Sequence, residues 1–202
     1  AFGVGPATIG FVTTLVWVGS ALPRIPVGYV LTRVPRHHVV LVAGGLLSVA
    51  AAFTASATSV WTLQLGALAI GIASGGYFVA AIPLIGELRP ERVGRSIGIH
   101  GTAAQIAAVI AAPVAVAAVT ALDWRAAFWA LAATAAVTTI LLAGTARAIE
   151  GQIGTGPDRD FSAVLTHWRV VAVGLIMIAV AGFVWQGVFN FYVSYLIDAK
   201  SI

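Results

Sequence analysis

Long apolar stretches alternate with short charged segments along almost the whole chain. A helix that crosses a bilayer needs about 20 mostly apolar residues, and the stretches between charged segments have about that length. None of them shows the period-two alternation that the strands of a membrane barrel require. We therefore predict an all-α, polytopic membrane protein with six transmembrane helices, at about residues 8–31, 39–57, 62–86, 96–119, 126–144 and 170–191.

One long interval without charge needs two helices. No Asp, Glu, Lys or Arg occurs between Arg36 and Glu87, which is too long a stretch for a single span. It fits two helices joined by a tight turn, which we place at residues 58–61. The longest polar stretch, residues 145–169, precedes the last predicted span.

The composition supports a membrane protein. Hydrophobic residues make up 60% of the chain and charged residues 9%, whereas soluble domains have roughly 45–50% and 25%. This excludes an ordinary water-soluble domain. The chain has no cysteine, which excludes disulfides, thiolate metal sites and cysteine nucleophiles.

The basic residues indicate the orientation. Lys and Arg concentrate in the cytoplasmic loops of membrane proteins. In this chain, successive loops differ strongly in the number of Lys and Arg residues that they carry. One side receives Arg33, Arg36, Arg89, Arg92, Arg95, Arg147, Arg159 and Arg169, and the other receives Arg125 and Lys200. We expect loops 32–38, 87–95 and 145–169 to be cytoplasmic, in a multi-pass protein of the cell (plasma) membrane. The formal net charge of +4 is thus an orientation signal, and we expect no nucleic-acid partner.

Several loops resemble those of one transporter family. Residues 28–37, Gly-Tyr-Val-Leu-Thr-Arg-Val-Pro-Arg-His, resemble the motif G-x-L-x-D-R-x-G-R-K/R between helices two and three of the major facilitator superfamily. Gly28, Arg33 and Arg36 match it, and Thr32 replaces the Asp. Residues 87–95 resemble the loop between helices four and five, residues 123–128 resemble the W-R-x-x-F entry to helix six, and residues 145–169 resemble the central loop.

The resemblance implies a domain organisation and a charged latch. The resemblance implies that the six predicted spans correspond to helices two to seven of a fold of about twelve helices. We therefore expect the chain to be a fragment. Residues 1–145 form most of the N-terminal half, residues 146–169 the central loop, and residues 170–202 the first helix of the C-terminal half. In the family, the motif's charges pair with a carboxylate at the end of helix four and steady the outward-facing state. The latch residues here would be Gly28, Arg33, Arg36 and Glu87, with Arg33 as the partner of Glu87. The alternative is that these arginines only follow the positive-inside rule.

Arg24 is the one charged residue inside a predicted span. It lies nine residues before Arg33, about 13 Å along a helix, and half of the hydrocarbon thickness is about 15 Å. Ionisable groups at such depth are costly and usually functional. We interpret Arg24 as a substrate-binding or coupling residue. The alternative is a structural arginine that snorkels or binds carbonyls freed by Pro23 and Pro26.

The residues around Arg24 bear on the class of solute. Residues 20–28, Ser-Ala-Leu-Pro-Arg-Ile-Pro-Val-Gly, resemble the helix-two arginine region of the nitrate/nitrite porter branch of the superfamily. A guanidinium suits a planar oxyanion or carboxylate. Residues 98–105, Gly-Ile-His-Gly-Thr-Ala-Ala-Gln, depart from that branch's Gly-rich, Asn-containing signature on helix five. The resemblance therefore leaves an anionic solute open without specifying nitrate.

Four further polar residues inside predicted spans are candidate site residues. His100 is a candidate for coupling to H+, because imidazole changes charge near neutral pH, or a neutral histidine bonded between helices. Gln105, near the midplane, either lines a pocket or joins two helices, since its amide needs a partner there. Gln186 and Asn190 share one helix face, which we interpret as lining a water-filled path; the alternative is that the aromatic residues near this end of the span form an interfacial belt.

Small residues and prolines predict how the helices pack. Ala67, Gly71 and Gly75 recur every four positions, as do Gly94, Gly98 and Thr102, the spacing that lets membrane helices approach closely. Pro83 and Pro113 lie inside predicted spans and should kink them.

We therefore expect a secondary active transporter that moves a small solute by alternating access. A channel and a membrane scaffold that transports nothing are the alternatives. The expected partners are the lipid bilayer, a small-molecule substrate and a coupling ion such as H+. The chain has no H-E-x-x-H pair and no nucleotide-binding loop, so we expect no enzyme activity, cofactor or metal site.

Overall fold

A computed structural model describes residues 6–149 and 166–200 of the chain, and these residues form helices and turns. The chain divides into two compact units, Ala1–Pro157 and Asp158–Ile202. The first unit contains helices α1 (Pro6–Ala21), α2 (Arg24–Val30), α3 (Arg36–Ala55), α4 (Val60–Leu88), the short 3-10 helix η1 (Pro90–Arg92), α5 (Val93–Ala121) and α6 (Trp124–Ile149). The second unit contains α8 (Trp168–Lys200).

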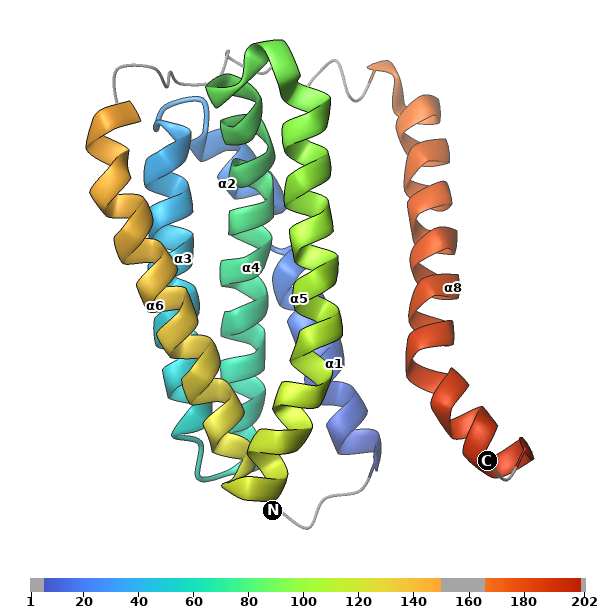
Figure 1. Ribbon diagram of the computed structural model, residues 1–202. Coiled ribbons are helices and arrows are strands. Elements are labelled where there is room, and N and C mark those ends of the chain that lie inside the picture. Colours follow the sequence, from blue (N-terminus) through green and yellow to red (C-terminus); the bar gives the residue numbers. More distant parts are fainter. Residues whose placement is uncertain (1–5, 150–165, 201–202) are drawn as a thin grey trace. The chain divides into compact units, whose positions relative to one another are not determined.

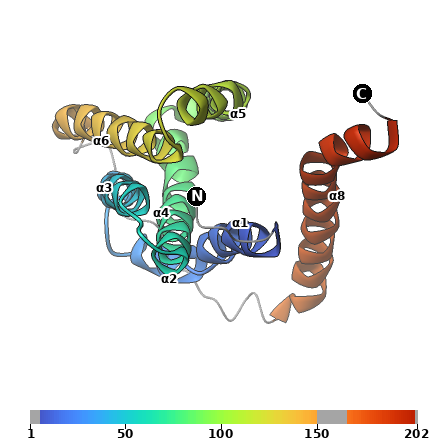
Figure 2. The same cartoon turned by 90° about the horizontal axis from the view of Figure 1, so that it is seen from below.

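The helices of the first unit form a bundle around α4 (Figures 1 and 2). Helix α4 packs against α1, α2, α3 and α5, and α6 packs against α3 and α5. Helices α1 and α2 run in the same direction, and the chain then reverses between α2 and α3, α3 and α4, α4 and α5, and α5 and α6, so the segment before α3, η1 and the end of α6 lie at the same end of the bundle (Figure 1). We call this the basic end, because it carries the described side chains of Arg33, Arg36, Arg89, Arg92 and Arg95.

The bundle has the dimensions and surface of a membrane domain. Five segments of the described chain are long and apolar enough to cross a bilayer: Gly10–Val30, Arg36–Ala55, Val60–Leu88, Pro90–Ala121 and Trp124–Ala146. Large hydrophobic side chains stand exposed on these helices, with Val109 at 75% and Ile140 at 68%. Such surfaces are stable in lipid and costly in water. The predicted all-α membrane fold is confirmed, and the sixth predicted span lies within α8.

Two predicted boundaries differ from the structure. The span at residues 8–31 is divided into α1 and α2, because Pro23 and Pro26 lack the N–H groups that would bond the carbonyls four residues earlier. Helix α6 continues to Ile149, so the predicted polar stretch 145–169 starts inside a helix. Ala146, which is 8% exposed, extends the packed face of α6 past residue 144.

Local signals explain other helix ends. Ser59 caps α4, because its hydroxyl accepts the Thr62 N–H at 3.3 Å while its own N–H donates to the Thr62 hydroxyl at 3.1 Å. This reciprocal capping satisfies two backbone donors and ends the turn that separates α3 from α4. Helix α3 begins after Pro35, whose extended backbone (φ −56°, ψ 139°) is typical of a residue that precedes a helix. Helices α4 and α5 both continue through their internal prolines, Pro83 and Pro113.

Glycines bring α1 and α4 into direct backbone contact. A Cβ added at Gly71 would lie 2.2 Å from the Val16 carbonyl oxygen, and one at Gly19 would lie 2.4 Å from the Leu68 carbonyl oxygen. Ala67, one turn before Gly71, is 3% exposed. Close packing along this stripe is confirmed.

The corresponding stripe on α5 meets no neighbour among the described residues. A Cβ added at Gly94 or Gly98 would meet nothing within 4 Å among the described residues. No described residue packs against these two positions, because α4 and α6 contact other faces of α5. Close helix packing there stays a prediction.

Candidate functional site

Arg24 occupies the break between α1 and α2. It is the first residue of α2, and its side chain is exposed in the bundle. The Arg24 Nε–H donates to the Ser20 carbonyl oxygen at 3.3 Å. Within the described residues, the two terminal nitrogens of this guanidinium have no hydrogen-bond or ion-pair partner. The geometry is compatible with both a structural and a substrate-binding role of Arg24. Its Nε atom binds the backbone, and its two terminal NH2 groups are left to donate to a ligand.

The contact between α1 and α4 positions this break. A Cβ added at Gly75 would lie 2.3 Å from the Ser20 carbonyl oxygen and 2.9 Å from Cγ of Pro23. Only a glycine at this place lets α4 approach the carbonyl that holds Arg24. Pro23 itself is buried, so the break is part of a packed interface.

An ion pair joins α3 and α4 at the basic end. The Arg36 guanidinium donates to the Glu87 carboxylate, with the Arg36 side chain 8% exposed and the Glu87 side chain 29% exposed. Arg33, which we expected to pair with Glu87, instead lies over the Tyr29 ring at 4.8 Å from its centroid. The reason is position: Arg36 starts α3, whose flank faces α4, whereas Arg33 is exposed in the turn before it. Gly28 is buried in α2.

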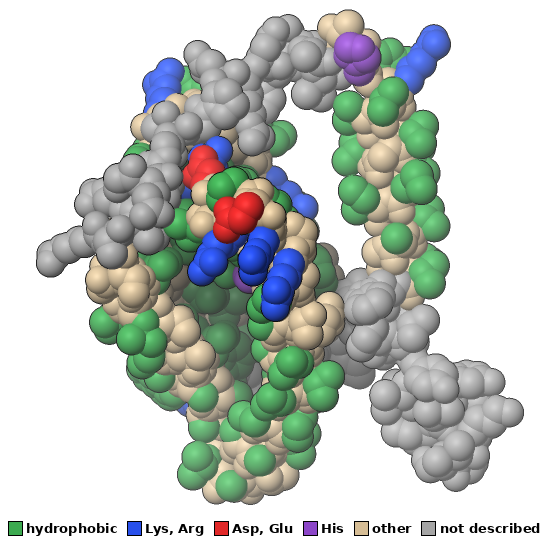
Figure 3. Space-filling view, turned by 45° about the horizontal axis from the view of Figure 1, so that its top comes forward, with side chains coloured by type: hydrophobic (Ala, Val, Ile, Leu, Met, Phe, Trp, Pro, Cys, Tyr) green, Lys and Arg blue, Asp and Glu red, His purple; other side chains and the backbone are tan. Residues whose placement is uncertain are grey.

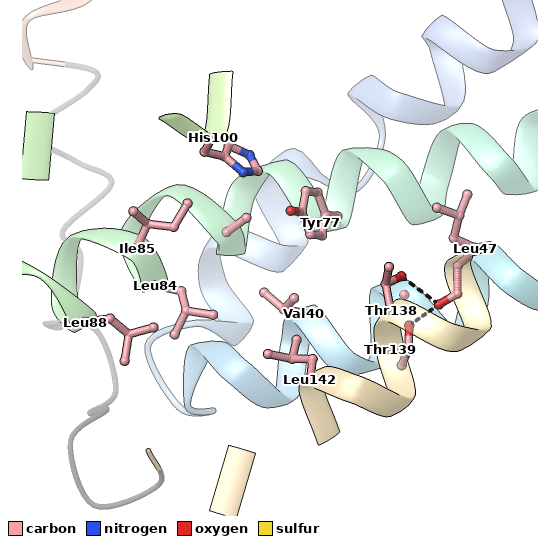
Figure 4. Close-up of a pocket in the computed structure, with 13 residues that line it drawn as sticks. Val40, Leu47, Tyr77, Leu84, Ile85, Leu88, His100, Thr138, Thr139 and Leu142 are labelled. Atoms are coloured by element: carbon pink, nitrogen blue, oxygen red, sulfur yellow. Dashed lines mark hydrogen bonds between the residues drawn. The ribbon is translucent and has the colours of Figure 1, made fainter. Parts of the chain in front are cut away.

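A cavity of about 540 Å³ lies between α3, α4, α5 and α6. Figure 4 shows its walls: aliphatic side chains of α3, α4 and α6 surround the space, and His100 of α5 and Tyr77 of α4 face it. The lining residues are Val40, Gly44, Leu47, Tyr77, Ala81, Leu84, Ile85, Leu88, His100, Ala135, Thr138, Thr139 and Leu142. The cavity reaches toward the basic end, because Leu88 follows directly after Glu87.

His100 and Tyr77 are the main polar groups of this cavity. Their ring centroids are 6.1 Å apart, and the buried Nε2 of His100 has no hydrogen-bond partner among the described residues. The hydroxyls of Thr138 and Thr139 both donate to the Ala135 carbonyl oxygen, at 3.1 and 2.7 Å, so only their lone pairs remain for a ligand. The cavity therefore suits a largely apolar molecule or a proton that binds the imidazole.

The structure does not bring all the predicted substrate residues together. His100 lines the cavity, whereas Arg24 and Gln105 do not. Gln105 is exposed on α5. Gln186 and Asn190 lie on α8, and their side chains are outside the described residues.

Sequence reasoning missed Tyr77, Thr138 and Thr139. The available signal was a hydroxyl-bearing side chain within an apolar span, since such groups need a polar partner in lipid. Tyr77 near the middle of the span 62–86 and the adjacent threonines in the span 126–144 both fit that criterion.

Comparison with known families agrees with this architecture. The family model of the Major Facilitator Superfamily matches residues 1–201. The chain therefore belongs to the major facilitator superfamily, and it is a multi-pass membrane protein whose general function is secondary transport. No solved structure matches the chain.

Proposed function

We propose that this protein moves a small anionic solute across the plasma membrane by alternating access, and that Arg24 binds the solute. The observation that carries the proposal is the Arg24 guanidinium. It lies in a proline-induced break of a membrane-spanning segment, with Nε held by Ser20 and two terminal nitrogens without a partner among the described residues. A positive charge inside a membrane span costs free energy. An anionic solute that binds Arg24 during transport would neutralise this charge.

The nitrate/nitrite porter branch is a narrower form of the same proposal. Its support is the arginine between two prolines in the first span, and residues 98–105 depart from the branch's pattern on helix five. Planar oxyanions and carboxylates share the geometry that a guanidinium binds with two parallel hydrogen bonds. The proposal therefore covers both groups of solutes.

His100 is the candidate for proton coupling. Its support is the buried Nε2 atom that faces the cavity without a partner in the described part of the chain. A neutral imidazole with a free ring nitrogen can accept H+. If transport is coupled to H+ through this group, His100→Gln should abolish the stimulation of uptake by a pH gradient and preserve exchange of solute in the absence of a gradient.

Transport by the full-length protein in proteoliposomes tests the role of Arg24. We would compare nitrate, nitrite and small carboxylates with neutral and cationic solutes, and measure both uptake and counterflow. We expect saturable uptake and counterflow for at least one anion, since a channel gives no counterflow. Arg24→Lys should lower uptake of that anion at least tenfold while insertion is preserved, because an ammonium cannot reproduce the planar two-nitrogen fork.

The matched control is Arg125→Lys at the opposite end of the bundle. Arg125 donates to the Ala57 carbonyl oxygen at 2.7 Å and is remote from Arg24, so the KM for the anion should stay unchanged. Normal anion transport by an Arg24→Ala variant would refute the assignment. Transport restricted to neutral or cationic solutes would refute the anionic class.

A further inference from the structure

We propose that Gly75 of α4 is a positioning residue for Arg24, and that it gives the transport site a preference for planar anions over spherical ones. The inference rests on the proposed function, in which Arg24 binds the solute. It adds that the backbone of α1, packed against a residue of α4 that has no side chain, fixes the direction in which the guanidinium points.

Gly75 lies against the backbone that holds Arg24. A Cβ added to Gly75 would lie 2.3 Å from the carbonyl oxygen of Ser20, 2.8 Å from the Ser20 Cα atom and 2.9 Å from Cγ of Pro23. The first two atoms belong to the backbone and the third to a closed ring, so no change of rotamer makes room. Gly75, Ser20 and Pro23 are all buried, and the contact is internal to the packed interface of α1 and α4.

The same carbonyl oxygen accepts the hydrogen bond of Arg24. The Arg24 Nε–H donates to it at 3.3 Å, near the upper limit for a bond between N–H and oxygen. Carbon and carbonyl oxygen normally approach to about 3.3 Å, so a methyl group on residue 75 would displace this oxygen by about 1 Å. A bond that is already long does not survive such a shift. The missing side chain of Gly75 therefore keeps the Arg24 Nε atom in place.

A guanidinium that is held at Nε presents its two terminal nitrogens in a restricted direction, because the group is planar. A planar oxyanion or carboxylate accepts one hydrogen bond from each of these nitrogens in parallel. A spherical halide has no pair of oxygens that matches their spacing. A fixed guanidinium therefore favours planar anions, whereas one that rotates freely offers mainly its charge.

The arginines of the basic end do not supply this preference. In Figure 3, Lys and Arg side chains lie side by side at that end of the bundle, next to acidic side chains. Exposed cations of this kind attract anions through their summed charge, whatever the shape of the anion. Discrimination by shape therefore depends on the guanidinium within the span.

The anion selectivity of the full-length protein in proteoliposomes tests the proposal. Uptake of the transported anion would be measured with nitrate, acetate and bromide as competing probes. Because an oriented, charge-assisted hydrogen bond is lost, Gly75→Ala should lower the preference for nitrate and acetate over bromide at least about fivefold. Gly76→Ala is the matched control. Gly76 is also buried, and its added Cβ would meet the Val27 side chain at an ordinary 3.7 Å, so the preference should stay unchanged.

A double variant separates positioning from a general loosening of the bundle. Arg24→Lys alone should lose most of the preference, because an ammonium has no planar fork. Adding Gly75→Ala to Arg24→Lys should then lower the preference no further, since no fork is left to orient. Additive effects of the two substitutions would show that Gly75 only stabilises the bundle, and would overturn the proposal.

NMR of arginine labelled with a heavy nitrogen isotope measures the hydrogen bond without transport. The Arg24 Nε–H signal is assigned by its loss in Arg24→Lys. In the wild type, we expect this proton to exchange with water more slowly than those of exposed arginines such as Arg33 and Arg92. In Gly75→Ala, its exchange should approach theirs. Equally fast exchange in the wild type would overturn the proposal, and this result does not require Gly75→Ala to fold.

These measurements distinguish the role of Gly75 from the proposed function. A wild type that transports no anion would refute the proposed function and the planar preference together. A wild type whose anion transport depends on Arg24, and whose planar preference is unchanged in Gly75→Ala, would refute only the role of Gly75.

Discussion

Replacing Gly71 with alanine tests whether direct backbone contact between α1 and α4 stabilises the bundle. A Cβ at this position would lie 2.2 Å from the Val16 carbonyl oxygen and 3.0 Å from the Gly19 Cα atom. Carbon and carbonyl oxygen normally approach to about 3.3 Å or more. Because both obstacles are backbone atoms, no rotamer change relieves the clash, and α1 must move away from α4 by about 1 Å.

The energetic cost follows from this displacement. Inserting a methyl group into a packed interface costs about 1–3 kcal/mol. Helix association in lipid depends on close van der Waals contact, and the shift would loosen contacts along the whole of α1. We therefore expect Gly71→Ala to lower the free energy of unfolding by about 2–3 kcal/mol.

Gly45→Ala is the matched control. Gly45 lies within α3, and an added Cβ there has nothing within 4 Å. Alanine is a better helix former than glycine, so this variant should be neutral or more stable by up to about 1 kcal/mol. Denaturant titration of the purified protein in detergent, followed by circular dichroism, measures both variants. Equal stability of Gly71→Ala and Gly45→Ala would show that the α1–α4 contact is not as close as described.

Two other predictions concern the charged groups. Glu87→Gln removes the carboxylate that pairs with the largely buried Arg36 and should cost about 2–3 kcal/mol in the same titration, somewhat less than breaking a fully buried pair. Asp123→Asn, which breaks an exposed pair, should cost under about 1 kcal/mol, and equal losses for the two variants would contradict this account. Because the chain has no cysteine, single cysteines at the exposed positions Arg33, Arg92 and Thr58 can be labelled in intact cells with an impermeant maleimide. The first two should react only from the cytoplasm and Thr58→Cys only from outside, and the opposite pattern would reverse the orientation.

The positions of the membrane helices could be predicted from the sequence because lipid offers no hydrogen bonds to the backbone. Each apolar segment must satisfy its N–H and C=O groups within itself, so it becomes a helix whatever its neighbours are. Pro23 and Pro26 lack backbone donors in any environment, so the sequence predicted freed carbonyls near Arg24, but it did not predict that the span divides into two helices there. The grouping of the arginines at one end followed from the alternating direction of successive spans.

Contacts between helices depended on tertiary structure. The Arg36–Glu87 pair, the exposed position of Arg33 and the His100–Tyr77 cavity depend on how each helix is rotated about its axis and how deep it lies. Neither quantity is encoded by local hydropathy, since every face of these helices is apolar. Gly71 and Gly98 illustrate this: both belong to stripes with the same four-residue spacing, yet α1 covers the first, and no described helix covers the second. The spacing permits close approach, and the arrangement of neighbouring helices decides where it happens.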